Sequence, residues 1–221
     1  MRHLFQPRVL NHASLAAALS ALACYPRLNL WLHRPAPIWY LEATIFICGI
    51  MLWGFVFAWH EFYTKRPAFV FKLELKPFVV AALMGIGAAL AVHQWLDPAL
   101  RPKMPEDYPV DLPHWFALAL FSLAFNQLFL IFAPFAWLMR LFKNRWVAGS
   151  LTVLFGACVL LMKAQSLPTS VPTPLVVAFV AGKVITGSLA IWFYLRGGVI
   201  LVWWWALLFE SRHLLDLIGS Y

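Results

Sequence analysis

The chain has 221 residues, of which 63% are hydrophobic and 12% charged, and its formal net charge is +8. Soluble domains are closer to half apolar and a quarter charged, so this composition excludes an ordinary soluble domain and predicts an integral membrane protein. The positive charge does not indicate a nucleic-acid partner, because the sequence has no lysine- and arginine-rich block interleaved with aromatic residues.

Apolar runs of about 20 residues, enough to cross a bilayer as a helix, recur along the chain. The first segment, 9–24, is shorter and either spans the membrane or lies in its interface. Prolines mark most of the segment edges, where a helix tolerates them. We predict an all-α, polytopic transmembrane bundle that forms one integral membrane domain over residues 1–221. Six further helices are expected to span, at 38–59, 77–96, 114–140, 146–163, 173–195 and 198–217.

Loop charge predicts the orientation of these helices. Lysine and arginine concentrate on the cytoplasmic side of membrane proteins. The loop at 97–113 is acidic and is expected outside, whereas the loops before and after it are basic and are expected inside. The basic residues are Lys65, Arg66, Lys72 and Lys76 in one loop and Arg140, Lys143 and Arg145 in the other.

Three ionisable residues fall within or at the ends of predicted spans, where charge is costly and is by default a sign of function. Glu42 lies inside the helix at 38–59, His93 in the last turn of 77–96, and Lys183 near the middle of 173–195. Glu42 and Lys183 are candidates to neutralise each other across the bundle. The structural alternatives are an interfacial carboxylate, a packed histidine and a lysine whose ammonium reaches toward the interface.

Asn126 and Gln127 are adjacent amides in the middle of the apolar stretch 115–139. Such groups are costly in lipid unless they find hydrogen-bond partners. Pro134, in the same helix, should kink it and release a carbonyl near Leu130. We therefore expect the amides to form a hydrogen-bonded joint beside that kink.

Two clusters at span ends contain residues that can bind metals. His60 and Glu61 close the helix at 38–59, but the second histidine of an H-E-x-x-H zinc helix is missing. Glu210 and His213 share a helix face at i,i+3 and could bind a divalent metal if other helices supplied ligands. Arg212 and Asp216 are spaced to pair at i,i+4. The alternative for both clusters is a solvated, charged helix end.

Trp203, Trp204 and Trp205 cover most of a helix circumference at one level. They cannot all face the core, and indole N–H groups need partners, so some should reach the interface or bond a neighbouring helix. An aromatic wall against lipid, another subunit or a pigment is one interpretation.

The C-terminal half, residues 114–217, resembles the CPBP family, also called Abi or CAAX-protease-like. The first motif of that family has two adjacent glutamates and an arginine; Asn126, Gln127 and Ile131 stand at those positions. The second motif places a histidine four residues after a phenylalanine, and here Phe155 is followed by Val159. The turn at 139–146 and the stretch Tyr194–Gly198 resemble family turns, which puts the last histidine near Ala206 or Leu207 and its asparagine near Glu210 or Ser211.

The resemblance implies an intramembrane metal-dependent peptidase fold from which the catalytic groups have been lost. A neutral amide neither acts as a general base nor binds a metal as a carboxylate does. We therefore expect a non-catalytic scaffold, assembly factor or accessory subunit without a cofactor, whose partners are membrane lipids and other membrane subunits. Loop charge and the resemblance indicate the bacterial inner membrane.

Two alternatives stay open. The first is a metallopeptidase with relocated ligands drawn from His60, Glu61, Glu210 and His213. The second is a small transporter or pigment-binding subunit centred on Lys183, Glu42 or His93, although no pair of broken helices typical of transporters is evident.

Overall fold

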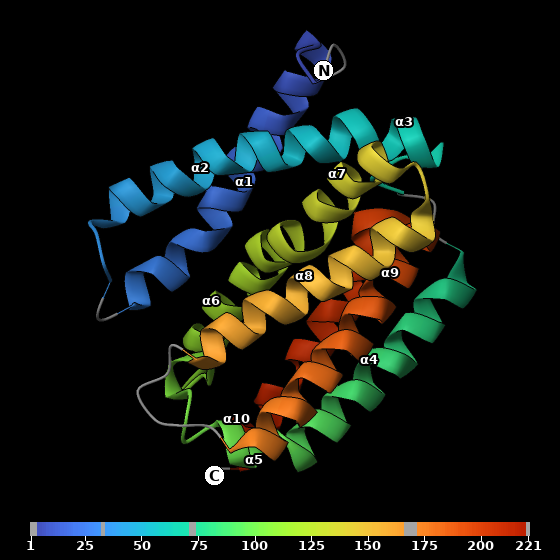
Figure 1. Ribbon diagram of the computed structural model, residues 1–221. Helices are drawn as coiled ribbons and strands as arrows, with labels where there is room; N and C mark the ends of the chain where they lie inside the picture. Colours follow the sequence, from blue (N-terminus) through green and yellow to red (C-terminus); the bar gives the residue numbers. More distant parts are fainter. Residues whose placement is uncertain (1–3, 32–33, 71–73, 166–171, 220–221) are drawn as a thin grey trace.

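The computed structural model describes residues 4–31, 34–70, 74–165 and 172–219, and it confirms the all-α prediction. The described residues form helices joined by short loops (Figure 1), and Lys72 of the predicted inner loop lies outside them. The main helices are α1 (Pro7–Leu30), α2 (Ile38–Phe55), α4 (Leu75–Trp95), α6 (Leu112–Phe121), α7 (Ala133–Phe142), α8 (Arg145–Gln165), α9 (Thr173–Glu210) and α10 (Arg212–Gly219). Short helices and wide turns connect them: η1 (Val56–His60), α3 (Glu61–Thr64), α5 (Asp97–Leu100), η2 (Pro105–Asp107), η3 (Ser122–Asn126) and η4 (Leu128–Phe132).

Five of the described helices are long and apolar enough to cross a membrane: Ile38–Thr64, Leu75–Trp95, Leu112–Phe142, Arg145–Gln165 and Thr173–Ile218. They make the chain an integral membrane protein. The last contains a chain reversal, so it comprises the two helices predicted at 173–195 and 198–217. Helix α1 is not among the five; it packs along α2 and against α6.

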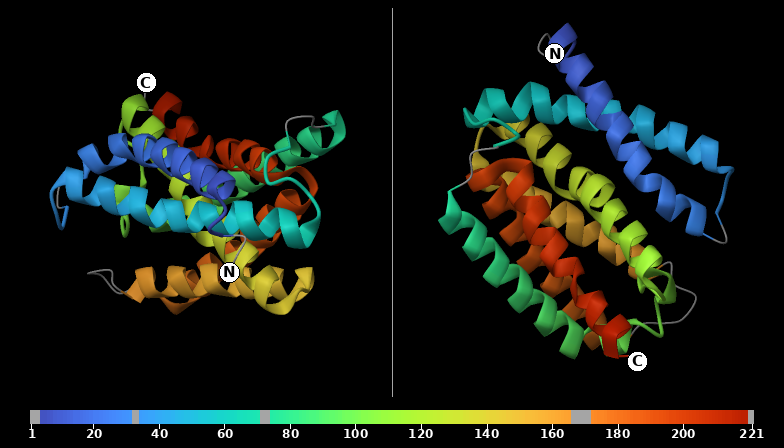
Figure 2. Two further views of the ribbon diagram at one scale, coloured as in Figure 1. Left: turned by 90° about the horizontal axis from the view of Figure 1, so that it is seen from above. Right: turned by 180° about the vertical axis from the view of Figure 1, so that it is seen from behind.

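The reversal within α9 is built around Gly198, whose backbone has φ +64° and ψ −157°. Only glycine adopts this conformation readily. The segment after α3 covers the turn: the Val199 N–H donates to the Ala68 carbonyl at 2.8 Å, and the Arg66 guanidinium donates to the Leu195 carbonyl. The two halves of α9 therefore run antiparallel, as the return of the chain in Figure 2 shows.

The helix at Leu112–Phe142 is continuous but contains two wide π turns, η3 and η4, directly before Pro134. Proline cannot donate to the carbonyl one turn earlier, and its ring clashes with that carbonyl in an α-helix. The π turns widen the helix where this conflict would arise, so the predicted kink takes the form of two wide turns. Turns of this kind are frequent at functional sites.

The core lies where the N-terminal helices meet the long helix and the α9 reversal. Trp53, Phe132, Phe135 and Tyr194 are fully buried there, and the Tyr194 ring lies 4.8 Å from that of Phe132. Helix α8 lies on the face toward the viewer in Figure 1, whereas α1 and the second half of α9 lie on the face seen from behind in Figure 2.

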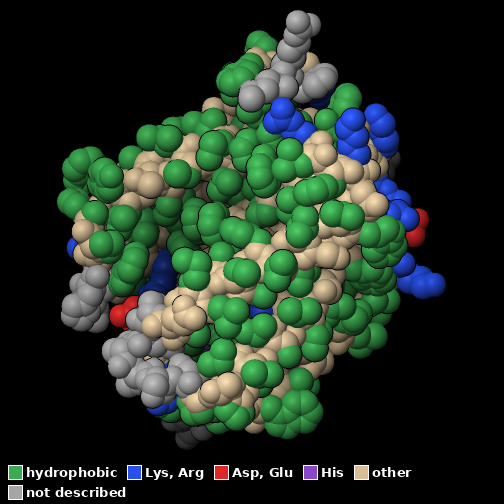
Figure 3. Space-filling view, in the orientation of Figure 1, with side chains coloured by type: hydrophobic (Ala, Val, Ile, Leu, Met, Phe, Trp, Pro, Cys, Tyr) green, Lys and Arg blue, Asp and Glu red, His purple; other side chains and the backbone are tan. Residues whose placement is uncertain are grey.

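The two ends of the bundle differ in charge, as the loops predicted. Lysine and arginine side chains gather at the end where α3 and the α7–α8 turn lie, and hydrophobic side chains cover much of the face between the ends (Figure 3). The opposite end carries α5, α10 and the acidic loop (Figure 1). Which end faces the cytoplasm stays a prediction from the loop charge.

Candidate functional site

A polar cavity of about 150 Å³ lies inside the bundle between the long helix and the two halves of α9. The long helix contributes Asn126 and Gln127 from its π turns. The first half of α9 contributes Lys183, and the second half contributes Trp205 and Glu210. The reversal at Gly198 creates this site, because it brings residues on either side of the turn to the same level of the bundle.

Glu210 is the best-held group of the cavity. The Ser122 hydroxyl donates to its Oε1 at 2.7 Å, and its Oε2 lies 3.4 Å from Nη1 of Arg212 and 3.8 Å from Nε2 of His213. The spacing of Glu210 and His213 on one face is therefore as predicted. These contacts hold the carboxylate at the cavity wall.

Lys183 interacts electrostatically with Glu210, and both line the cavity. The expectation that Glu42 neutralises Lys183 is therefore wrong. Glu42 lies on α2, and its carboxylate interacts electrostatically with the Cys24 thiol of α1. The stem of Lys183 runs along α8, where a Cβ added to Gly156 would lie 3.4 Å from its Cε.

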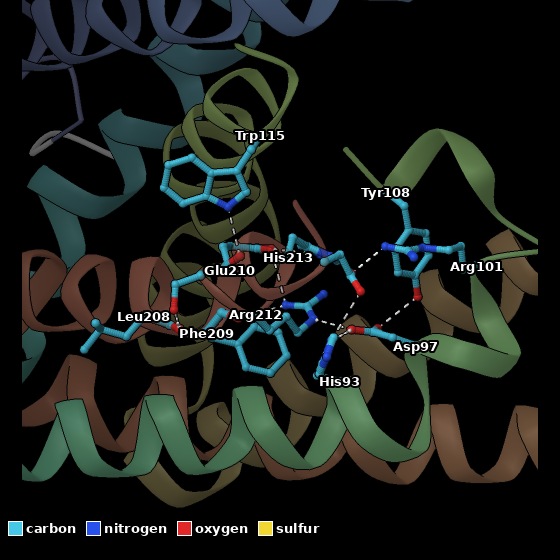
Figure 4. A network of polar contacts seen from close by, with 12 residues as sticks. His93, Asp97, Arg101, Tyr108, Trp115, Leu208, Phe209, Glu210, Arg212 and His213 are labelled. Carbon is cyan, nitrogen blue, oxygen red and sulfur yellow. Dashed lines mark hydrogen bonds and ion pairs between the residues drawn. The ribbon is translucent and has the colours of Figure 1, made fainter. Parts of the chain in front are cut away.

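A second cavity, of about 210 Å³, adjoins the first toward the acidic end, and Lys183, Thr186 and Phe209 line both. Part of its wall belongs to the polar network drawn in Figure 4. Asp97, only 5% exposed, accepts a hydrogen bond from the Tyr108 hydroxyl at 2.9 Å and lies 3.3 Å from Nε of Arg212. Burial, and next the Asp97 carboxylate, raise the pKa of the Tyr108 phenol, which keeps it a donor.

The charged pairs of this network differ from the predicted one. Arg212 contacts Asp97 and Glu210, whereas Asp216 contacts Arg101 and lies 3.9 Å from Nδ1 of His93. The i,i+4 spacing of Arg212 and Asp216 was the only local signal, and longer-range partners on α4 and α5 outweigh it. The network ties α10 to the acidic end of the bundle, and its members Asp97, Tyr108 and Arg212 line the second cavity together with Lys183.

Asn126 and Gln127 do not form the expected joint. Among the residues that the structure describes, no hydrogen bond joins either side-chain amide to another group. Their half-buried amides instead line the cavity, where they present unused donors and acceptors to its interior. The carbonyl released by Pro134 is accommodated by the π turns and not by these amides.

The four candidate metal ligands lie at opposite ends of the bundle. His60 packs against Tyr194 with ring centroids 4.4 Å apart, near the basic end, whereas His213 packs against Tyr108 at the acidic end. No group of three or more His, Cys, Asp or Glu residues suited to a metal occurs in the described parts of the chain. His60, Glu61, Glu210 and His213 therefore do not form one site.

The three tryptophans face three different neighbours inside the chain. The Trp203 Nε1 donates to the Leu123 carbonyl at 2.8 Å, and the Trp204 Nε1 donates to the Phe78 carbonyl at 3.3 Å. Trp205 is 3% exposed, and its Nε1 has no partner among the described residues. Hydrogen bonds from the indoles to neighbouring helices were one of the expected outcomes. The interpretation as an outward aromatic wall is wrong, because the α9 hairpin places the three tryptophans between α4 and the long helix.

The motif positions of the resemblance meet at the cavity in part. Asn126, Gln127, Ile131, Ala206 and Glu210 all line it, whereas Val159 on α8 does not. Sequence reasoning missed Ser122, Asp97 and Tyr108. Ser122 precedes Asn126 by one helical turn, which was a usable signal, but nothing local connects Asp97 with Tyr108.

No model of a known protein family, no curated protein and no solved structure matches the chain. The function is therefore argued from the site.

Proposed function

We propose that this protein is a non-catalytic, CPBP-like membrane protein of the bacterial inner membrane, acting as a scaffold, assembly factor or accessory subunit of a membrane complex. The observation that carries the proposal is the position of the Lys183 side chain, which lines the cavity together with Glu210, Asn126 and Gln127. The CPBP-like resemblance would place a metal site in this region.

The cavity does not fit a divalent metal. Its ionisable wall groups are the Glu210 carboxyl and the Lys183 amine, and the other polar side chains are neutral amides, hydroxyls and an indole. A metal site needs several anionic or imidazole ligands. The single carboxylate is also already in contact with the Arg212 guanidinium, at 3.4 Å.

Binding instead of catalysis is supported by the remaining polar groups. Three polar side chains that line the cavity have no hydrogen-bond partner among the described residues. They are the amides of Asn126 and Gln127 and the buried indole N–H of Trp205. A membrane chain of 25.2 kDa with large apolar outer faces is suited to association with other subunits.

The experiment is to extract a tagged chain from its native membranes in mild detergent after brief lysine- and carboxylate-directed crosslinking. We expect a complex well above the mass of the monomer, with one defined membrane protein crosslinked to it. A tagged polytopic membrane protein expressed at the same level is the control for random collisions. If the chain runs alone, or if its crosslinks match those of the control, the accessory role is wrong.

A further inference from the structure

A third hollow, larger than the two cavities described above, is distinct from the intramembrane site. A groove of about 1200 Å³ runs between α8 and the first half of α9, which lie side by side, and it ends at the segment before α4 (Figure 1). Its α8 wall extends from Arg145 to Leu161, or about 24 Å at 1.5 Å per residue. That length exceeds one leaflet of a hydrocarbon core about 30 Å thick.

The groove is apolar along its length and cationic at one end. Small residues at Gly149, Ser150, Ala157 and Ser188 leave room between the helices, and aliphatic side chains form most of the remaining wall. The basic end is lined by three arginines, Arg66, Arg145 and Arg196, with Glu74 as the acidic residue beside them. No ion pair joins any of these arginines to another residue in the described parts of the chain.

Two of the arginines are held in place by contacts that leave their charge available. The Arg196 guanidinium lies 4.0 Å from the centre of the Trp192 ring, and Arg66 donates to the Leu195 carbonyl. Both contacts fix the guanidinium at the groove mouth without neutralising it.

A smaller pocket of about 420 Å³ continues from this end of the groove. It shares Arg66, Arg145, Trp146 and Leu195 with the groove and adds polar groups from Tyr63, Thr64, Lys143 and Asn144. The combined hollow is therefore amphipathic: a polar, cationic chamber opens into a long apolar channel.

We propose that this hollow binds one anionic phospholipid of the inner leaflet, with the phosphate among Arg66, Arg145 and Arg196 and an acyl chain along α8 and α9. Arginine forms bidentate hydrogen bonds with phosphate, and the apolar groove can bury the acyl chain. The basic end faces the cytoplasm by its loop charge, and the cytoplasmic leaflet carries the anionic lipids.

The test is native mass spectrometry of the full chain released from nanodiscs that contain equal amounts of phosphatidylglycerol and phosphatidylcholine. We expect one retained phosphatidylglycerol per chain and at least a tenfold preference over phosphatidylcholine. Equal retention of the two lipids overturns the proposal without any variant. Displacement by millimolar glycerol phosphate also overturns it, because the site would then recognise a soluble phosphate and not a lipid.

Variants locate the lipid. The triple variant R66Q/R145Q/R196Q should lose the preference, and Ser150→Trp should lower retention of both lipids because it fills the channel. Arg140→Gln is the matched control, since Arg140 lies at the same basic end but stacks on Trp59 outside the groove. A triple variant that keeps the tenfold preference, or an Arg140→Gln variant that loses it equally, overturns this placement. If the triple variant fails to fold, Arg145→Gln alone takes its place in the test. It is the milder change, because Arg145 lies at an exposed helix start.

Discussion

Gly198→Ala should prevent most of the chain from reaching its native bundle. A Cβ at this position would lie 2.2 Å from the Ala68 carbonyl oxygen, and the backbone conformation there is one that side chains rarely adopt. The strained backbone alone costs about 1–3 kcal/mol. The clash adds to that cost, because Val199 bonds the same carbonyl and the segment cannot simply move away. We expect a loss of at least about 3 kcal/mol, measured as aggregation on extraction or as a large fall in the thermal midpoint in detergent.

Gly87→Ala is the matched control, because a Cβ at Gly87 meets nothing within 4 Å. It should leave the thermal midpoint unchanged or raise it slightly, since alanine favours helix by up to about 1 kcal/mol over glycine. If Gly198→Ala is extracted and melts like the Gly87→Ala variant, the reversal is not built as described. The α9 hairpin, and the cavity that depends on it, would then need to be reconsidered.

Glu210→Gln should destabilise the protein because it removes the carboxylate that interacts electrostatically with Lys183 across the cavity. The change also weakens the contacts of the side chain with Arg212 and His213, while an amide can still accept from Ser122. A hydrogen bond to a charged group contributes about 1.5–3 kcal/mol. We expect the lower end of that range, since Glu210 is partly exposed and Arg212 keeps Asp97 as a partner. Chemical or thermal unfolding in detergent measures the loss.

The double variant Lys183→Met/Glu210→Gln should recover much of that stability, because neither charge then remains without the other. The four proteins form a double-mutant cycle whose coupling energy we expect to exceed about 1 kcal/mol. Glu42→Gln combined with Lys183→Met is the control cycle. Its two stability changes should be additive, because Glu42 interacts electrostatically with Cys24 of α1 and does not line the cavity. Additive effects of the Lys183 and Glu210 changes would show that the two groups do not share one electrostatic site.

Much of the fold could be predicted because apolar length and loop charge are local signals. The six spans from 38 to 217 appear where the hydrophobic runs and prolines placed them, and the basic loops gather at one end of the bundle. The reversal between 195 and 198 was also expected, although its dependence on the carbonyl of Ala68 was not.

The site was harder to predict because its residues come from distant segments. Lys183 and Glu210 lie 15 and 12 residues on either side of Gly198, so a hairpin at that glycine would have brought them to similar levels. The sequence did not indicate which helices would pack against the hairpin. For that reason Glu42 was considered as the partner of Lys183, and an outward aromatic wall was one interpretation of the three tryptophans.

The hydrogen-bond partners of the two amides were equally hard to predict. Asn126 and Gln127 were correctly singled out as polar groups inside the bundle, but their partners could not be inferred from spacing. The π turns rotate them toward the α9 hairpin and its cavity, and an ordinary α-helical projection of the sequence does not contain those turns.

We expect the cavity to hold no divalent metal, because a lysine lines it and the ligands that a metal needs are absent from its described wall. The most direct test is the divalent metal content of the chain purified from native membranes without chelator. We expect far less than one zinc, manganese, iron or cobalt ion per chain, with no change in His213→Ala or His60→Ala. One tightly held metal ion per chain, lost on His213→Ala, would contradict the account and restore a metal-dependent enzyme.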